Sequence, residues 1–245
     1  MTTSNQDSLL QSILLHILPG ALGTVVYVVL APILIQNGYP AMLALIIGVG
    51  AIAIPFELGY LFLTAKRISG TFSLKPVIQL RNPLPKWQYF VLPVAMVIWA
   101  FLASGALSLV DPMIARTLFG WLPDWFFVFD PSQYLAFSRE ALMTTFYVIL
   151  VINGLLGPIT EELYFRGHLL PRLSGLGNWA PFVNISLFSL YHFWTPWEFF
   201  SRIIWLLPWG YVVWRKKNIY LMMIAHCTVN ILGALLTWGR ILGQS

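Results

Sequence analysis

Residues 157–167, Gly-Pro-Ile-Thr-Glu-Glu-Leu-Tyr-Phe-Arg-Gly, place two carboxylates and an arginine directly after an apolar run of the chain. Charged residues make up only 9% of the sequence, so this concentration of charge is unusual. An ionisable side chain at membrane depth is energetically costly, and such residues commonly serve a function. The stretch therefore supplies the first candidates for a functional site.

Local signals predict that a helix begins within this stretch. Gly157-Pro158 is expected to end the preceding segment, and Thr160 is a suitable N-cap residue. The two glutamates that follow would then lie in the first turn, where the helix dipole favours negative charge.

The spacing assigns different roles to the two glutamates. Glu162 and Arg166 are four residues apart, so they share one helix face and can form a salt bridge. Glu161 is turned away from that pair by about 100°, because a helix has about 3.6 residues per turn. We therefore expect Glu162 to be structural and Glu161 to be free to accept a proton from water.

The composition indicates a membrane protein. Of the 245 residues, 58% are hydrophobic, and the mean hydropathy is +0.77. These values predict an all-α fold of the polytopic membrane class.

The net charge of +5 comes from short basic clusters between apolar runs, so we attribute it to orientation in the lipid bilayer and expect no nucleic-acid partner. The single Cys227 excludes an internal disulfide and a cysteine-based metal cluster.

Seven apolar segments are expected to lie in the membrane, with the N-terminus inside and the C-terminus outside. They are approximately Ile13–Ile35, Ala41–Ala65, Trp87–Val110, Tyr134–Leu156, Trp179–Phe193, Phe199–Trp214 and Ile219–Trp238. A helix needs about 20 residues to cross a hydrocarbon core about 30 Å thick, so either of the short fifth and sixth segments could be half-embedded. We divide the chain into N-terminal helices and loops (1–140) and a C-terminal core that contains the two adjacent glutamates (141–240), within one integral membrane domain overall.

Charged loops predict the orientation. Lys66 to Lys86 contains five basic residues and no acid, and Arg215-Lys216-Lys217 is a second basic cluster, so both are assigned to the cytoplasm. Asp111 to Gln133 is acidic and rich in aromatic residues, which favours an aromatic belt at the outer face. The two glutamates would then lie towards the cytoplasmic side. The short chain and the lack of a retention signal favour a bacterial plasma membrane.

Two later apolar segments contain polar residues at helical spacing. His192 follows Phe188 by four residues, and Asn230 follows His226 by four, so each pair would share a helix face. A single intramembrane histidine is more often a hydrogen-bonded core residue than a catalytic one. Together, however, a carboxylate, two imidazoles and a carboxamide suffice to activate water and to stabilise an oxyanion.

Two polar residues of the first half are not assigned to this site. Glu57, which follows Pro55, is explained at least as well by a polar gap between helices as by a function. His16 has no second ligand type at helical spacing, so we interpret it as an interfacial or hydrogen-bonded histidine.

The polar residues fall into three ordered motifs: Glu161-Glu162-x-x-x-Arg166, Phe188-x-x-x-His192 and His226-x-x-x-Asn230. This set resembles the motifs of the CAAX-protease and bacteriocin-processing (CPBP) family of intramembrane endopeptidases, which includes the type II CAAX prenyl endopeptidase. The resemblance covers roughly Val148 to Leu236, and the first half of the chain carries no motif of the family. The second and third motifs are weak individually, whereas the ordered set within apolar segments is specific.

The resemblance implies a role for each residue. Glu161 and His192 would activate the attacking water, and His226 with Asn230 would stabilise the oxyanion, while the predicted salt bridge would be structural. No cofactor is required in this mechanism. In an alternative, Glu161, His192 and His226 ligate a divalent metal such as zinc, with an open position for water. The absence of a His-Glu-x-x-His sequence argues against a zincin-like site.

The favoured function is therefore an intramembrane endopeptidase that hydrolyses a peptide bond of a membrane-associated protein or peptide near the cytoplasmic surface. The alternative is a non-catalytic membrane transporter or a bacteriocin-immunity protein, because a proton relay would use the same polar residues. A transporter more often has inverted repeats with broken helices in both halves, whereas here the motifs gather in one half of the chain.

Overall fold

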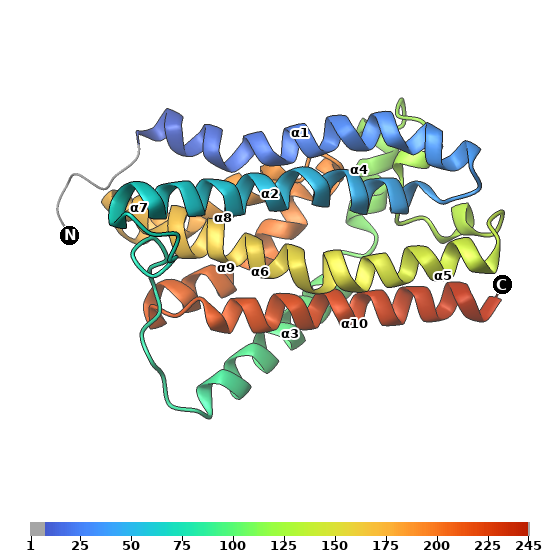
Figure 1. The fold of residues 1–245 in the computed structure, drawn as a ribbon. Helices are drawn as coiled ribbons and strands as arrows, with labels where there is room; N and C mark the ends of the chain where they lie inside the picture. The colour runs from blue at the N-terminus through green and yellow to red at the C-terminus, as the bar shows by residue number, and fades with distance from the viewer. Residues whose placement is uncertain (1–7, 245) are drawn as a thin grey trace.

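The computed structural model describes residues 8–244, and every regular element in that range is helical (Figure 1). The α-helices are α1 (Leu9–Gln36), α2 (Ala41–Ser69), α3 (Gln88–Ala106), α4 (Val110–Leu118), α5 (Arg139–Val148), α6 (Gly157–Glu161), α7 (Leu170–Arg172), α8 (Ala180–Tyr191), α9 (Phe199–Lys216) and α10 (Tyr220–Gln244). Wider π-helical turns form η4 (Ile149–Leu156) and η5 (Glu162–Leu169), and 3-10 turns form η2 (Asp124–Phe126), η3 (Pro131–Tyr134), η6 (Ser174–Trp179) and η7 (Pro196–Glu198). The predicted all-α fold is confirmed.

Residues 139–172 form one continuous helical segment of 34 residues, in which α5, η4, α6, η5 and α7 follow one another. The prediction that a helix begins at Thr160 is therefore wrong. Gly157-Pro158 does not end the preceding segment, and the two glutamates lie well inside the long helix rather than in a first turn.

The π-helical turns of η4 explain how the helix passes through a proline. The Gly157 N–H donates to the Ile152 carbonyl, five residues back. The matching acceptor for Pro158 would be the Asn153 carbonyl, but proline has no N–H to donate. Asn230 of α10 supplies the missing donor, because its Nδ2 lies 2.8 Å from the Asn153 oxygen. A tertiary contact thus replaces the backbone bond.

Among residues 8–244, five helical segments are long and apolar enough to cross a membrane: α1, α2, α3, the 139–172 helix and α10. Two of the seven predicted segments are not among them. These form α8 and α9, which pack against each other as a hairpin. The 12 residues of α8 span only about 18 Å at a rise of about 1.5 Å per residue, so α8 is too short to cross the bilayer core.

The two basic loops lie together at one end of the helical bundle, with the start of α1, while the end of α10 lies at the opposite end (Figure 1). The Asn82 N–H donates to the Lys217 carbonyl at 2.8 Å, and the Ile219 N–H donates to the Leu80 carbonyl at 2.9 Å. Both loops must therefore face the same side of the membrane, as the charge pattern predicts. We call this end of the molecule the basic end.

We expect labelling of introduced cysteines to show the basic end in the cytoplasm. Ten of the fourteen Lys and Arg residues lie in the two basic loops or at Arg166 and Arg172, and such an excess marks the inner side. In a Cys227→Ser background, Lys75→Cys should resist a membrane-impermeant maleimide applied to intact cells, whereas Asp124→Cys should react. Reaction of the cysteine at position 75 from outside would reverse the orientation.

The acidic, aromatic connection between α3 and α5 partly folds into the bundle. Phe126 is only 6% exposed, and its ring contacts Tyr27 of α1 and Trp197 of η7. The prediction that this connection forms an aromatic belt is therefore wrong for Phe126, which belongs to the core. Trp121 is 78% exposed and is consistent with the predicted belt. The connection covers the end of the bundle opposite the basic loops.

Candidate active site

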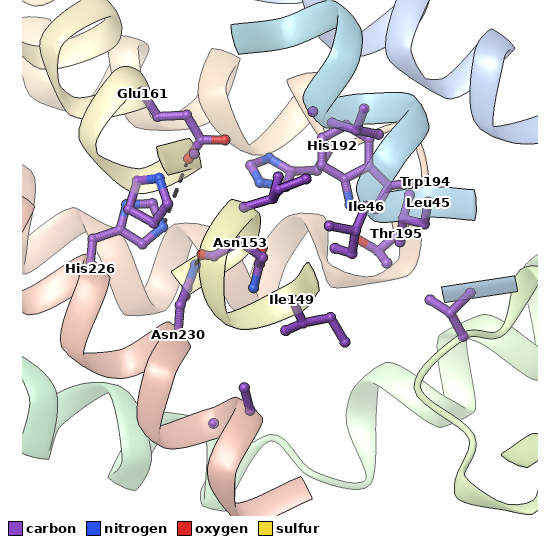
Figure 2. A pocket seen from close by; sticks show the side chains of 18 of the residues that line it. Leu45, Ile46, Ile149, Asn153, Glu161, His192, Trp194, Thr195, His226 and Asn230 are labelled. Carbon is purple, nitrogen blue, oxygen red and sulfur yellow. Dashed lines mark hydrogen bonds and ion pairs between the residues drawn. The ribbon is translucent and has the colours of Figure 1, made fainter. Parts of the chain in front are cut away.

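A cavity of about 400 Å³ lies among α2, the 139–172 helix, the α8–α9 hairpin and α10. Glu161, His192, His226 and Asn230, the four predicted catalytic residues, all line it (Figure 2). They come from segments that are far apart in the sequence, so the fold brings together the groups that the motifs single out. Many of the other lining residues are apolar, among them Met42, Leu45, Val128, Ile149, Ala234 and Trp238.

The cavity extends from the polar groups away from the basic end. Its described lining includes Val128 and Tyr134 of the α3–α5 connection, but no residue of the basic loops. His226 lies six residues after the start of α10, which places it about 9 Å from the basic end of that helix. The reacting groups would thus sit nearer the basic end, and the apolar part of the cavity reaches deeper into the bundle.

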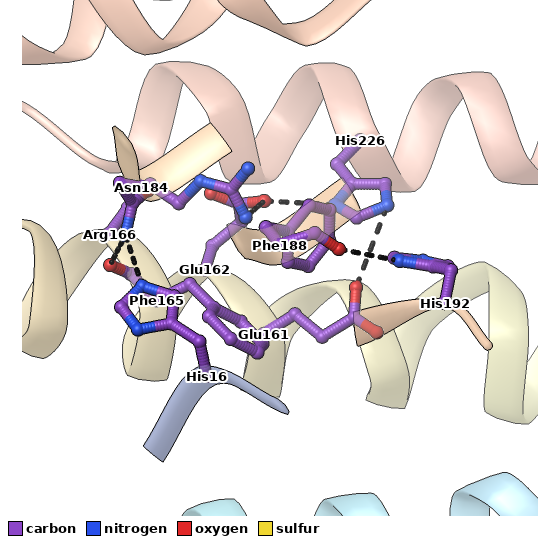
Figure 3. A network of polar contacts seen from close by, with 9 residues as sticks. All are labelled: His16, Glu161, Glu162, Phe165, Arg166, Asn184, Phe188, His192 and His226. Atoms are coloured by element: carbon purple, nitrogen blue, oxygen red, sulfur yellow. Dashed lines mark hydrogen bonds and ion pairs between the residues drawn. The ribbon is translucent and has the colours of Figure 1, made fainter. Parts of the chain in front are cut away.

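His226 lies between the two glutamates (Figure 3). Its Nδ1 is 2.9 Å from Glu162 Oε1, and its Nε2 is 3.8 Å from Glu161 Oε2. A carboxylate only accepts hydrogen bonds, so the ionised Glu162 fixes a hydrogen on Nδ1 and turns Nε2 towards Glu161 and the cavity. Glu162 is therefore more than the arginine's partner, because it also orients the imidazole. The motif spacing gave no signal for this second role, because the two residues are 64 positions apart.

The Glu162–Arg166 salt bridge predicted from the spacing is present. Arg166 Nη1 lies 3.4 Å from Glu162 Oε1, and both side chains are fully buried. The aromatic ring of Phe188 covers the guanidinium, with its centroid 4.0 Å from Arg166 Cζ. A buried cation is stabilised by such a partner and such a ring. The Phe of the second motif thus shields the charge pair of the first.

We expect Glu162→Ala to lower the free energy of unfolding by about 3–5 kcal/mol, because it leaves Arg166 buried without its carboxylate. Chemical unfolding in detergent micelles would measure the change. The double variant Glu162→Leu/Arg166→Met should recover much of that stability, since an apolar pair replaces the buried ions. It should not recover activity, because His226 still lacks its acceptor. Wild-type stability of Glu162→Ala would contradict a structural role for the salt bridge.

His192 has one ring nitrogen committed to the backbone. It follows the last residue of α8, and its Nδ1 donates to the Phe188 carbonyl at 2.8 Å. The hydrogen is therefore on Nδ1, and Nε2 keeps a lone pair that can accept a proton or orient water. Figure 2 shows the ring directed into the cavity on the side facing Glu161.

Asn230 presents its amide group at the cavity wall. One hydrogen of its NH₂ group is donated to the Asn153 carbonyl, which fixes the orientation of the carboxamide. The second hydrogen stays free to bind a negatively charged oxygen. The bond to Asn153 was not predictable from the motif, because it depends on the π-helical turns before Pro158.

Three further charged residues line the cavity: Glu57 of α2, Glu198 of η7 and Arg202 of α9. Arg202 forms a salt bridge with Glu198, and its Nη2 also donates to Thr195 Oγ1 at 2.8 Å. The four-residue spacing of Glu198 and Arg202 is typical of a salt bridge along a helix, so this pair could have been predicted from the sequence. Glu57 was recognised as an isolated acid but was not assigned to the site.

The start of α9 is also tied to the α3–α5 connection. Ser201 Oγ donates to Asp111 of α4. Burial raises the pKa of the Asp111 carboxyl, and the hydrogen bond from Ser201 opposes that shift.

His16 is a buried, hydrogen-bonded histidine, as the sequence analysis interpreted it. Its Nδ1 lies 2.7 Å from the Ser12 carbonyl, and its Nε2 accepts from Asn184 Nδ2 at 2.9 Å. Asn184 also donates to the Phe165 carbonyl at 3.0 Å (Figure 3). These bonds connect α1, α8 and the 139–172 helix outside the cavity. Nothing in the sequence pattern pointed to Asn184.

The residues of the described chain do not form a metal-ligand set as arranged. Within residues 8–244, no group of three or more His, Cys, Asp and Glu side chains is placed to hold one ion. In particular, Glu161 and His226 face each other, while Glu162 engages the other nitrogen of His226. The zinc alternative would need these side chains to move, so we derive no step through a metal.

Residues 143–232 match the family model described as "Type II CAAX prenyl endopeptidase Rce1-like". The matched segment contains all three motifs, so the resemblance predicted from them is confirmed. No curated protein and no solved structure gives a significant match.

Proposed function

We propose that this chain is an intramembrane endopeptidase, on the premise that residues 143–232 match the Rce1-like CAAX prenyl endopeptidases, a match that implies CAAX-type protease activity. One observation carries the proposal. Glu161, His192, His226 and Asn230 line a single cavity within a bundle of apolar helices, and Glu162 orients His226 towards that cavity. A base, an orienting imidazole and two groups able to bind an oxyanion are what hydrolysis of an amide requires.

In the proposed reaction, a water molecule binds between Glu161 and the free Nε2 of His192. Glu161 accepts a proton from this water as the oxygen attacks the carbonyl carbon of the peptide bond. His192 holds the water in place because its other nitrogen is fixed on the Phe188 carbonyl. Because both Glu161 and His192 hold the water, it has little orientational freedom left to lose when it attacks.

The negative charge that develops on the carbonyl oxygen would be stabilised by His226 and Asn230. Asn230 offers the second hydrogen of its carboxamide. His226 faces the oxyanion position with Nε2, because its Nδ1 is bound to Glu162, and the negative charge that develops there favours a proton on Nε2. Both donors are held by other bonds before substrate arrives, and such preorganised donors contribute strongly to acyl-transfer catalysis.

The substrate class follows from the cavity wall. Many of its side chains are apolar, and three candidate membrane spans (α2, the 139–172 helix and α10) contribute to its wall, so a membrane-associated peptide or protein with an apolar segment fits best. The reacting groups lie nearer the basic end. With the positive-inside orientation, cleavage would take place towards the cytoplasmic side.

The decisive experiment incubates the purified full-length protein in lipid nanodiscs with a library of membrane peptides. Mass spectrometry should detect new peptide termini with the wild type and none with Glu161→Ala. Cleavage should persist in EDTA; loss of cleavage in EDTA and its recovery with added Zn²⁺ would replace the glutamate mechanism by the metal alternative. Proton flux through vesicles without any cleavage would instead support the transporter.

A further inference from the structure

Hydrolysis of a peptide bond needs two proton transfers, and the residues placed so far account for one of them. Glu161 removes a proton from water. The nitrogen that leaves must also gain a proton, because an amide anion is far too basic to be expelled at neutral pH. A second acid in the cavity could supply that proton.

Glu57 is such an acid. It lies in the middle of the apolar helix α2, is only 1% exposed, and lines the same cavity as Glu161 and His226. Both of its carboxyl oxygens are buried. Among residues 8–244, the hydroxyl group of Tyr191 is the hydrogen-bonding group beside it. The carboxyl group is thus held in the cavity wall without an ion pair to a cation of the described chain.

The charges that face Glu57 favour its neutral, protonated form. Glu161 and Glu162 repel a negative charge at this position, whereas the cation Arg166 attracts one. That arginine is already paired with Glu162. A buried carboxyl without a paired cation is much more stable neutral than ionised. Glu161 has the His226 ring beside it, and this ring can stabilise a negative charge on Glu161. Of the two acids Glu161 and Glu57, Glu57 therefore holds the proton more firmly.

We propose that Glu57 is the proton donor to the leaving nitrogen, an assignment that rests on the proposed peptidase function. Water gives a proton to Glu161, and its oxygen bonds to the carbonyl carbon. The carbon–nitrogen bond then breaks, the Glu57 O–H proton bonds to the nitrogen, and Glu57 is left as a carboxylate. A proton passing from Glu161 to Glu57 restores both groups after the amine and the carboxylic acid have formed.

A merely structural role does not explain Glu57. A structural acid would be bonded to its surroundings, as Glu162 and Glu198 are bonded to their arginines. Glu57 has no such bond in the described chain, and an apolar residue of similar size would fill the space at lower cost. A reactive acid must face the cavity and must not be held by a cation, and Glu57 meets both conditions in the described chain.

The test compares an amide with an ester of the same sequence, assayed with the full-length protein in nanodiscs. An alcohol leaves more readily than an amine, so ester cleavage depends less on a proton donor. Glu57→Gln should lower kcat for the amide by about 10²–10⁴-fold and kcat for the ester by less than about tenfold. Glu57→Asp keeps a carboxyl group and should retain more of the amide activity than Glu57→Gln.

Glu198→Gln is the matched control, because it makes the same change at a partly buried cavity acid that is already paired with Arg202. It should affect amide and ester to a similar extent. If Glu57→Gln lowers both rates equally, or lowers neither, Glu57 is not the proton donor, even though the peptidase proposal stands. If the wild type cleaves neither substrate, the peptidase proposal itself fails and takes this assignment with it.

Discussion

Glu161→Gln is expected to reduce kcat for peptide cleavage by about 10²–10⁴-fold, the usual contribution of a general base. The amide has nearly the shape of the carboxylate but cannot accept the proton of the attacking water. Glu161 has one resolved polar contact within the described chain, the 3.8 Å approach to His226. Folded yield and thermal unfolding should therefore remain close to wild type. Both would be measured on the same detergent-purified samples as kcat.

Glu140→Gln serves as the control, because it makes the same chemical change at an exposed position of the same long helix. Its kcat should equal that of the wild type. Glu162→Ala should behave differently from Glu161→Gln, since it loses stability as well as activity. Equal losses of activity and of folding in the variants at positions 161 and 162 would contradict the division of roles between the two glutamates.

The parts of the site that were predictable from the sequence depend on spacing along one helix. The Glu162–Arg166 bond requires only that residues four apart share a face, and this holds even in the π-helical turns of η5. The ordered motifs likewise indicated which segments converge. Five of their residues line one cavity, namely Glu161, Phe188, His192, His226 and Asn230, although the roles assigned to them stay predictions.

The parts that were missed depend on contacts between helices. The bond from Glu162 to His226 joins residues 64 positions apart, and its geometry follows from how α10 packs against the long helix. The same packing supplies Asn230 as the donor that the Asn153 carbonyl needs beside Pro158. A local signal such as Gly157-Pro158 predicted a helix end, because no local rule includes a donor from another helix.

Glu57 illustrates a different limit. An isolated acid in an apolar helix has the same sequence pattern whether it fills a polar gap or faces a reaction site. Only the cavity distinguishes the two cases, since it places Glu57 with Glu161 and His226. The α3–α5 connection is similar: its aromatic residues suited an interfacial belt, but Phe126 packs against Trp197 at the tip of the α8–α9 hairpin.

Asn230→Asp is expected to lower kcat by about 10²–10³-fold, the scale for losing one oxyanion donor, with little change in KM. An ionised aspartate cannot donate to the oxyanion, and it places a repelling charge beside the tetrahedral intermediate. It also cannot donate to the Asn153 carbonyl, so thermal unfolding must be measured alongside. Asn230→Ala separates the effects, because it removes the donor without adding a charge and should still lose most of the activity.

Thr228→Val is the control for these variants, since it removes a polar group from the same helix where the hydroxyl only bonds back to the Ile224 carbonyl. Its kcat should stay within a factor of about two of wild type.

The rival mechanisms predict other outcomes for Asn230→Asp. A metal site could use the new carboxylate as a ligand, and a proton relay could keep transport with a shifted pH optimum. Wild-type cleavage by Asn230→Asp without added metal would mean that Asn230 is not an oxyanion donor. Its remaining role would then be the bond to Asn153, which holds α10 and the long helix in register beside Pro158.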